Sequence, residues 1–221
     1  MGFNVAIDGP AGAGKSTIAK IVAKEKSFIY VDTGAMYRAM AIHFINKGIS
    51  SDDSEKISEA VKDADVTIEY VDGAQQVLLN GENVTPFLRT EEVGNMASAS
   101  SVNGDVRKKL VELQQKLAET ANVVMDGRDI GTCVLPNAQV KVYLTASVDV
   151  RAERRYKELI EKGMKADLEK IKKDIEERDY RDMNRDISPL RQAEDAVLVD
   201  SSNLNIEESA KAILDLIDQV M

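Results

Sequence analysis

The segment Phe3–Thr17 constrains this chain more than any other, because it combines three local signals in a fixed order. An apolar run, Phe3–Ile7, is typical of a buried strand and ends at Asp8. The spacing GxxxxGKS follows at once at 9–16, and an amphipathic helical pattern begins directly after it. Strand, glycine-rich loop and helix in this order predict a phosphate-binding P-loop, whereas the same letters without that context would be a weak signal.

Each residue type in this loop has a chemical use. Its glycines let successive backbone N–H groups point inward and form an anion nest at the start of a helix. We expect Lys15 to contact the β- and γ-phosphates of a nucleoside triphosphate and the Ser16 hydroxyl to ligate Mg²⁺. The expected triphosphate-binding residues are Gly9, Pro10, Ala11, Gly12, Ala13, Gly14, Lys15, Ser16 and Thr17.

Composition excludes several other classes of protein. The 221 residues, 43% hydrophobic and 30% charged, are typical of one globular domain. A net charge of −9 and the absence of tryptophan disfavour nucleic-acid binding. No apolar stretch approaches the ~18 residues of a membrane span, and no signal-peptide layout precedes the first strand. The single cysteine, Cys133, fits a reducing cytoplasm, and the only histidine, His43, lies too far away in sequence to favour a cysteine nucleophile.

Four further apolar runs resemble buried parallel strands separated by helical material, and together with the first they predict a five-stranded parallel sheet in an α/β sandwich. These runs are Phe28–Val31, Val123–Met125, Val140–Leu144 and Ala196–Val199. Residues 63–90 interrupt this pattern with alternating apolar residues and the turn signals Asp72-Gly73 and Asn80-Gly81, which predict a small antiparallel insert. Residues 147–187 are charged and helical, with Gly163 expected to separate two helices.

Polar residues follow two of the predicted strands. After the second, Asp32 or Thr33 can cap a helix that carries Arg38, although a capped helix with a surface arginine is the simpler alternative. After the third comes Asp126–Thr132, whose first acid is placed to act on Mg²⁺ or its waters. A plain loop with local salt bridges is the alternative there.

Arginine is concentrated near the end of the chain, because seven of the eleven lie between Arg151 and Arg191. Arg178, Asp182 and Arg185 share one helical face if the helix persists that far, and intrahelical pairing is the plain alternative. A guanidinium donates two hydrogen bonds at once to phosphate, so the segment indicates a lid over a triphosphate. These features together predict phosphoryl transfer to an acceptor that needs no general base if it is itself a phosphate.

The motifs resemble those of the bacterial cytidylate kinase family, within the nucleoside monophosphate kinases, over essentially the whole chain. They are GPAGAGKST at 9–17, DTGAMYR at 32–38, RTEEVGNMAS at 89–98, DGRDIGT at 126–132 and ERDYRDMNR at 177–185. The resemblance implies ATP- and Mg²⁺-dependent phosphorylation of CMP and dCMP in pyrimidine metabolism by a cytoplasmic monomer. It also implies one kinase domain of 1–221, a P-loop NTPase three-layer sandwich. Its expected parts are a core of 1–34, 104–147 and 188–221, a monophosphate-binding lobe of 35–103 with the β insert, and a helical lid of 148–187.

The same resemblance implies roles for single residues. Arg154 is expected near the ATP adenine, Ser16 and Asp126 at the metal, and Lys15, Arg128, Arg178 and Arg185 in catalysis. The residues implied for CMP are Thr33, Arg38, Ser98, Arg107, Arg128, Asp129, Arg178, Asp182 and Arg185. Thr33 stands where the family usually has serine, which keeps the hydroxyl and adds a methyl group.

Two other functions remain as alternatives. Another small P-loop kinase is disfavoured by DGRDIGT and by the insert. A nucleotide-dependent switch that resembles Ras would carry Asn-Lys-x-Asp for guanine, and the nearest match here, Asn46-Lys47-Gly48-Ile49, lacks the acid.

Overall fold

The computed structural model describes residues 2–221, and its strands form two separate sheets. The strands are β1 (Asn4–Asp8), β2 (Ile29–Asp32), β3 (Val66–Val71), β4 (Ala74–Leu79), β5 (Glu82–Asn83), β6 (Val123–Gly127), β7 (Val140–Thr145) and β8 (Val197–Asp200). The α-helices are α1 (Lys15–Lys26), α2 (Thr33–Asn46), α3 (Ser54–Val61), α4 (Glu91–Ser100), α5 (Gly104–Thr120), α6 (Val148–Glu161), α7 (Leu168–Asn184) and α8 (Ile206–Asp218). A 3₁₀ turn, Thr85–Phe87, and a π-helical turn, Ile130–Val134, complete the elements.

The larger sheet has five strands in the order β2-β6-β1-β7-β8, which confirms the predicted α/β class with a five-stranded parallel sheet. Its centre is β1, which pairs in parallel with β6 and with β7. The register sets Asp8 opposite Gly127 of β6 and opposite Tyr143 of β7. The carboxyl ends of these strands therefore gather at one edge, which is where α/β sheets bind ligands.

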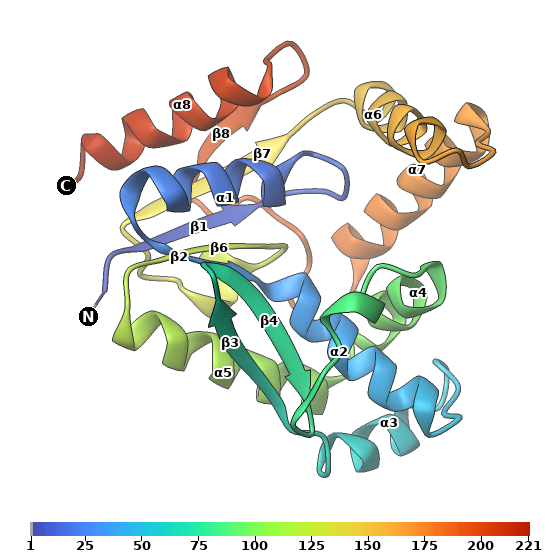
Figure 1. Cartoon of the computed structure of the whole chain (residues 1–221). Coiled ribbons are helices and arrows are strands. Elements are labelled where there is room, and N and C mark those ends of the chain that lie inside the picture. The colour runs from blue at the N-terminus through green and yellow to red at the C-terminus, as the bar shows by residue number, and fades with distance from the viewer. Residues whose placement is uncertain (1) are drawn as a thin grey trace. The chain divides into compact units, whose positions relative to one another are not determined.

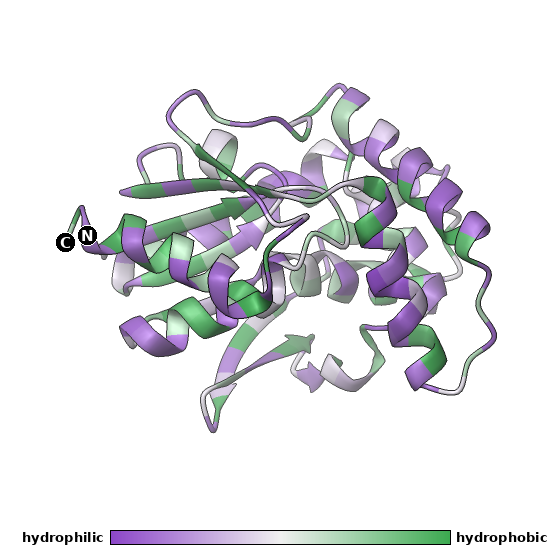
Figure 2. Ribbon diagram, turned by 90° about the horizontal axis from the view of Figure 1, so that it is seen from above, coloured by the Kyte–Doolittle hydropathy of each residue, from purple (hydrophilic) through white to green (hydrophobic). Residues whose placement is uncertain are grey.

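The helices α1 and α8 pack together on this sheet (Figure 1). Their apolar residues meet those of β1, β7 and β8 in one buried cluster that includes Ile7, Val22, Leu144 and Ile213. In Figure 2 the hydrophobic colour gathers on the strands, whereas the helices alternate hydrophilic and hydrophobic residues. Burial of this apolar surface at about 25 cal/mol per Å² stabilises the frame on which the β1–α1 loop is mounted.

The smaller sheet confirms the predicted antiparallel insert. Strands β3 and β4 form a hairpin with Val66 opposite Leu79, and the two residues of β5 extend it beyond β4. Both turn dipeptides have positive φ at each residue, 51° and 75° at Asp72-Gly73 and 51° and 83° at Asn80-Gly81. This is the backbone of a type I′ turn, for which Asp-Gly and Asn-Gly are suited.

The chain forms two compact units, Met1–Tyr30 with Ala121–Met221, and Val31–Thr120. The first carries the P-loop and the paired helices α6 and α7, which are separated at Gly163 (φ 72°) as predicted. The second carries α2 to α5 and the insert. The finer division into core, lobe and lid stays a prediction. None of the helices within residues 2–221 has the length and apolar character needed to cross a membrane.

Candidate active site

The loop between β1 and α1 has the backbone that an anion nest requires. Gly12 (φ 77°) and Gly14 (φ 89°) are left-handed, and Gly14 is the N-cap of α1. Gly9 (φ 150°) is required by close packing, because a Cβ there would lie 1.9 Å from the carbonyl oxygen of Leu144. The loop therefore passes close against β7 and ends at the start of α1, where the helix dipole favours negative charge.

The two loop residues predicted to do chemistry are both anchored. Lys15 is buried, and its Nζ donates to the Pro10 carbonyl oxygen at 2.7 Å. Ser16 Oγ donates to Asp126 Oδ2 at 2.9 Å, which joins α1 to the end of β6. Tyr30 Oη donates to the other carboxylate oxygen, Asp126 Oδ1, at 2.8 Å. Tyr30 was not among the predicted site residues, because nothing in its local sequence places it beside Asp126.

Ser16 and Asp126 fit a magnesium ion in chemistry, because both offer hard oxygen ligands at the carboxyl edge of the sheet. No cluster of three or more His, Cys, Asp or Glu that could hold a metal occurs within residues 2–221. A hydroxyl and one carboxylate form an incomplete set for Mg²⁺, which commonly takes its other ligands from water and nucleotide phosphates.

Two arginines add positive charge in the neighbourhood of Lys15. Burial lowers the pKa of Lys15 well below its usual value, and the Arg128 guanidinium and that of Arg178 lower it further. Asp126 and Asp8 act in the opposite direction. Two arginines close enough to disfavour a lysine charge, beside an anion nest, form a site that is complementary to a polyphosphate.

Asp8 connects the end of β1 to the segment that follows β6. Its two carboxylate oxygens accept hydrogen bonds from the Ile130 and Gly131 N–H groups, both at 2.7 Å. Asp8 is 4% exposed, and burial raises its pKa to about 6 although these two hydrogen bonds lower it. This carboxylate therefore holds the turn that carries Arg128 and Asp129.

The raised pKa of Asp8 predicts a measurable pH dependence of folding stability. Because the folded-state pKa is above the unfolded value, the folded chain binds more protons between about pH 4 and 6, and stability falls as pH rises through this window. From the shift of 3.8 to about 6, the loss is about 3 kcal/mol. The free energy of unfolding in urea is measured for wild type and for Asp8→Asn at several pH values. The expected loss is the change with pH in the difference between these two free energies. A difference that is constant from pH 4 to 6.5 would contradict the prediction.

The helix α7 supplies partners to the segment after β6. Arg128 Nε donates to Asp182 Oδ2 at 2.9 Å, and Arg185 Nη2 lies 3.7 Å from Asp129 Oδ1. Burial raises the pKa of Asp182, but Arg128, with the charges of Arg178 and Arg185, outweighs it and holds the pKa below its usual value. Asp182 and Asp129 thus each have an arginine as a neighbour, and Arg178 adds a third positive charge near Asp182. Arg185 lies just beyond α7, with extended backbone (ψ 143°), so it does not continue the predicted helical face.

The three arginines of α6 differ in what they contact. Arg151 is buried, and it donates to Ala11 O at 3.0 Å, Ala146 O at 2.9 Å and Asp179 Oδ2 at 2.6 Å. It therefore ties the P-loop to α7 instead of presenting its charge outward. Arg154 donates to the Ser201 carbonyl oxygen at 2.7 Å, and exposed Arg155 pairs with Glu158.

The unit Val31–Thr120 holds the other predicted site residues. Asp32 is the N-cap of α2, and its Oδ1 accepts from the Ala35 N–H at 2.9 Å, so the cap is Asp32 and not Thr33. The Arg38 side chain lies back toward the start of this helix. Its Nη1 would be 3.0 Å from a Cβ built at Gly34.

Two further predicted residues lie on helices that contact α2. Arg107 of α5 is buried, with its guanidinium carbon 5.9 Å from the centroid of the Tyr37 ring. The carbonyl oxygen of Ser98 on α4 accepts from Ser101 Oγ at 2.8 Å. The predicted site residues thus form two groups, one in each unit.

Comparison with known proteins identifies the family of the chain. The family model for cytidylate kinase matches residues 5–219. A cytidylate kinase from Caldicellulosiruptor saccharolyticus is 50% identical over 219 residues, covering 99% of this chain and 97% of its own. One from Bacillus subtilis is 48% identical over 217 residues, covering 98% and 97%. The chain belongs to the cytidylate kinase family.

Solved structures agree on the fold. An uncharacterized protein from Eubacterium ventriosum superposes with a TM-score of 0.56 at 13% identity, covering 98% of each chain. Shikimate kinase from Bacteroides thetaiotaomicron gives 0.50 at 14% identity, also covering 98% of each. At such low identity these likenesses concern the arrangement of elements and not the substrate.

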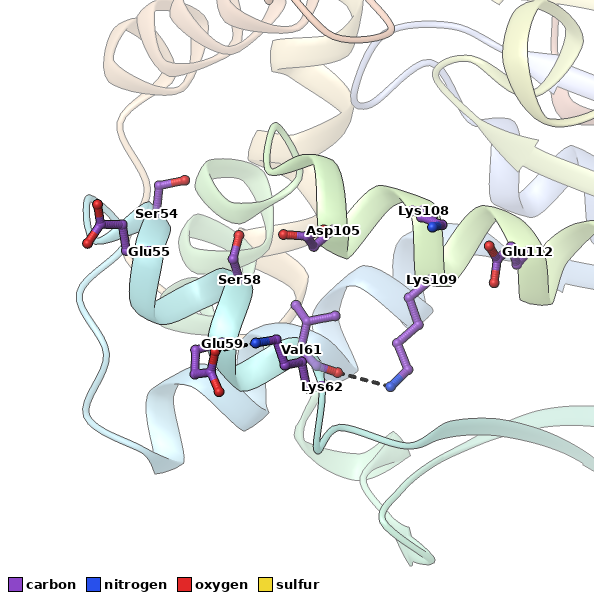
Figure 3. Close-up of a pocket in the computed structure, with 10 residues that line it drawn as sticks. All are labelled: Ser54, Glu55, Ser58, Glu59, Val61, Lys62, Asp105, Lys108, Lys109 and Glu112. Atoms are coloured by element: carbon purple, nitrogen blue, oxygen red, sulfur yellow. Dashed lines mark hydrogen bonds and ion pairs between the residues drawn. The ribbon is translucent and has the colours of Figure 1, made fainter.

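One cavity of this cytidylate kinase family member is lined by none of the predicted site residues. It measures about 650 Å³ and lies between α3 and α5, with Lys109 bonded to the Val61 carbonyl oxygen and Lys62 paired with Glu59 (Figure 3). Its acidic and basic side chains alternate and do not converge on one point.

The histidine and the cysteine of the chain are not among the predicted site residues. His43 is buried in α2, with its Nε2 3.1 Å from both the Ala60 carbonyl oxygen and Asp63 Oδ1. Cys133 is exposed within the turn Ile130–Val134.

Proposed function

We propose that this protein transfers the γ-phosphoryl group of ATP to CMP or dCMP and forms CDP or dCDP. The observation that carries the proposal is the convergence of Lys15, Arg128 and Arg178 beside the glycine loop. Membership of the cytidylate kinase family supports cytidine monophosphate as the acceptor.

The donor half follows from the loop Gly9–Thr17. Its N–H groups would cradle the phosphates of ATP, with Lys15 between the β- and γ-phosphates and Arg154 near the adenine. Ser16 and Asp126 would hold Mg²⁺, which when bound neutralises charge on the phosphate oxygens. Because Tyr30 occupies one oxygen of Asp126, the other is the one that faces Ser16.

The acceptor half rests on the residues that the family resemblance implies for CMP. We propose that Arg38 and Arg128 hold the phosphate of CMP, and that Ser98, Arg107 and Asp129 bind the cytosine. We propose that Arg178 and Asp182 reach the sugar, that Arg185 binds the base or the phosphate, and that the Thr33 hydroxyl also contacts the acceptor. Hydrogen bonding to the 4-amino edge of cytosine leaves buried groups unpaired when uracil enters, which provides selectivity.

The chemistry then needs positioning and charge more than proton transfer. The acceptor phosphate oxygen is already ionised, so no side chain has to remove a proton before attack. Lys15, Arg128, Arg178 and Arg185 would stabilise the charge of the transferring group. Closure of α6 and α7 would exclude water, which otherwise competes as acceptor. We further propose that the protein acts as a monomer in the cytoplasm, on nucleotides and not on nucleic acid or membranes.

A coupled assay tests the assignment. Purified protein with ATP and Mg²⁺ is offered CMP, dCMP, UMP, AMP and GMP, and ADP release is followed. We expect the highest kcat/KM with CMP or dCMP, and loss of turnover when the metal is removed with EDTA. Preference for AMP or for a non-nucleotide acceptor would contradict the assignment. Slow GTP hydrolysis without acceptor activity would favour the nucleotide switch.

A further inference from the structure

The residue that joins β2 to α2, Asp32, is held by the β insert as well as by its own helix. Its Oδ2 accepts from Arg89 Nη2 at 2.9 Å, while Oδ1 caps α2. Arg89 is 63% exposed, so this ion pair alone contributes little. Asp32 itself is buried and stands directly before Thr33.

The stronger connection is made by Gln75 of β4. The Asp32 N–H donates to Gln75 Oε1 at 2.8 Å, and Gln75 Nε2 donates back to the Asp32 carbonyl oxygen at 3.2 Å. One side-chain amide thus pairs with both backbone groups of one residue, as a neighbouring strand would. Gln75 therefore satisfies both backbone groups of Asp32 at the end of β2.

Alternation along β4 separates Gln75 from its neighbour Gln76. Gln75 shares a face with Val77 and Leu79, which are buried. Gln76 lies on the opposite face, where its Oε1 accepts from Asn83 Nδ2 at 2.9 Å within the insert. Only the first of the two glutamines therefore reaches Asp32.

We propose that Gln75 is a positioning residue for monophosphate binding, which it aids by holding the Asp32–Thr33 turn at the start of α2. The inference rests on the proposed function, in which Thr33 and Arg38 contact the acceptor. Asp32 has the extended backbone of a helix cap (φ −80°, ψ 93°), and the two hydrogen bonds keep its peptide groups in that orientation before the nucleotide arrives. A turn that is already ordered loses less entropy on binding, so affinity rises.

The test compares Gln75→Met with Gln76→Met in the full chain. Methionine keeps the length of the side chain and removes its hydrogen bonds. For Gln75→Met we expect KM for CMP to rise about three- to tenfold, from the loss of two hydrogen bonds, with kcat and KM for ATP within about twofold. For Gln76→Met we expect KM for CMP to stay within about twofold of wild type.

Amide hydrogen exchange of Asp32–Ala35 provides a readout that does not depend on activity. We expect faster exchange of these amides in Gln75→Met than in Gln76→Met. Equal KM values for CMP in the two variants, or a lower Tm of Gln75→Met with unchanged KM and exchange, would overturn the proposal. If wild type fails to phosphorylate CMP, the proposed function fails. Faster exchange in Gln75→Met alone would then still support the role of Gln75 at the turn, and equal exchange would overturn it.

Discussion

Replacement of Lys15 by methionine is expected to lower kcat with CMP about 10²- to 10³-fold, the range for loss of one preorganised group that stabilises transition-state charge. Lys15 is buried at the anion nest, where its Nζ is held by the Pro10 carbonyl oxygen. Methionine fills nearly the same space, so the loop keeps its packing while the charge is removed. Steady-state kinetics with saturating ATP and CMP measure the effect.

The same substitution is not expected to lower stability. The pKa of Lys15 is lower in the folded than in the unfolded chain, chiefly through burial and then through Arg128. Folding is therefore disfavoured wherever the unfolded lysine is charged, which includes neutral pH. Urea unfolding of Lys15→Met should give a free energy equal to or above that of wild type. Lys24→Met, on the exposed side of α1, is the control and should change neither property. A Lys15→Met protein that unfolds more easily and keeps its kcat would contradict both expectations.

Replacement of Arg178 by alanine is expected to lower kcat about 10²- to 10³-fold and to leave the fold intact. Arg178 lies on α7, and its positive charge lowers the pKa of Lys15. It also lowers the pKa of Asp182. We therefore expect it to stabilise the phosphoryl group in transfer. Its removal also relieves repulsion among the three cations, which opposes any loss of stability. Kinetics and thermal unfolding are measured together.

Two further variants serve as a control and as a conservative replacement for Arg178→Ala. Arg181→Ala changes an exposed arginine of the same helix, whose Nε is bonded to the Glu177 carbonyl oxygen, and should be nearly silent. Arg178→Lys keeps a charge but loses the planar fork, so it should recover only part of kcat. If Arg178→Ala retains wild-type kinetics with CMP, α7 is a solvated helix and not part of the active site.

Local patterns predicted most of the elements correctly. The five strands of the larger sheet, the hairpin with its two turn dipeptides and the break at Gly163 depend on residues only a few positions apart. Backbone preferences and side-chain alternation act over that range, which is why the pattern suffices. The shared face of Arg178, Asp182 and Arg185 depended on the helix reaching Arg185, whereas α7 ends at Asn184.

Contacts between distant segments could not be predicted in the same way. Asp8 meets Ile130 and Gly131 across more than a hundred residues, and Arg151 is buried against Asp179 although a charged helix predicts an exposed arginine. Such pairs depend on which strands become neighbours and on how the helices then pack. No local property of aspartate, arginine or glutamine encodes that choice.

The sequence by itself predicted a triphosphate site after β1, because the glycine spacing, lysine and serine of that loop lie within eight residues. It also determined the strands, the turns and the family, through motifs that are each contiguous. Only the tertiary structure decided the order of the strands, the pairing of Ser16 and Tyr30 with Asp126, and the hold of Gln75 on Asp32. These depend on backbone and side-chain groups that become neighbours only after the chain has folded and buried its apolar faces.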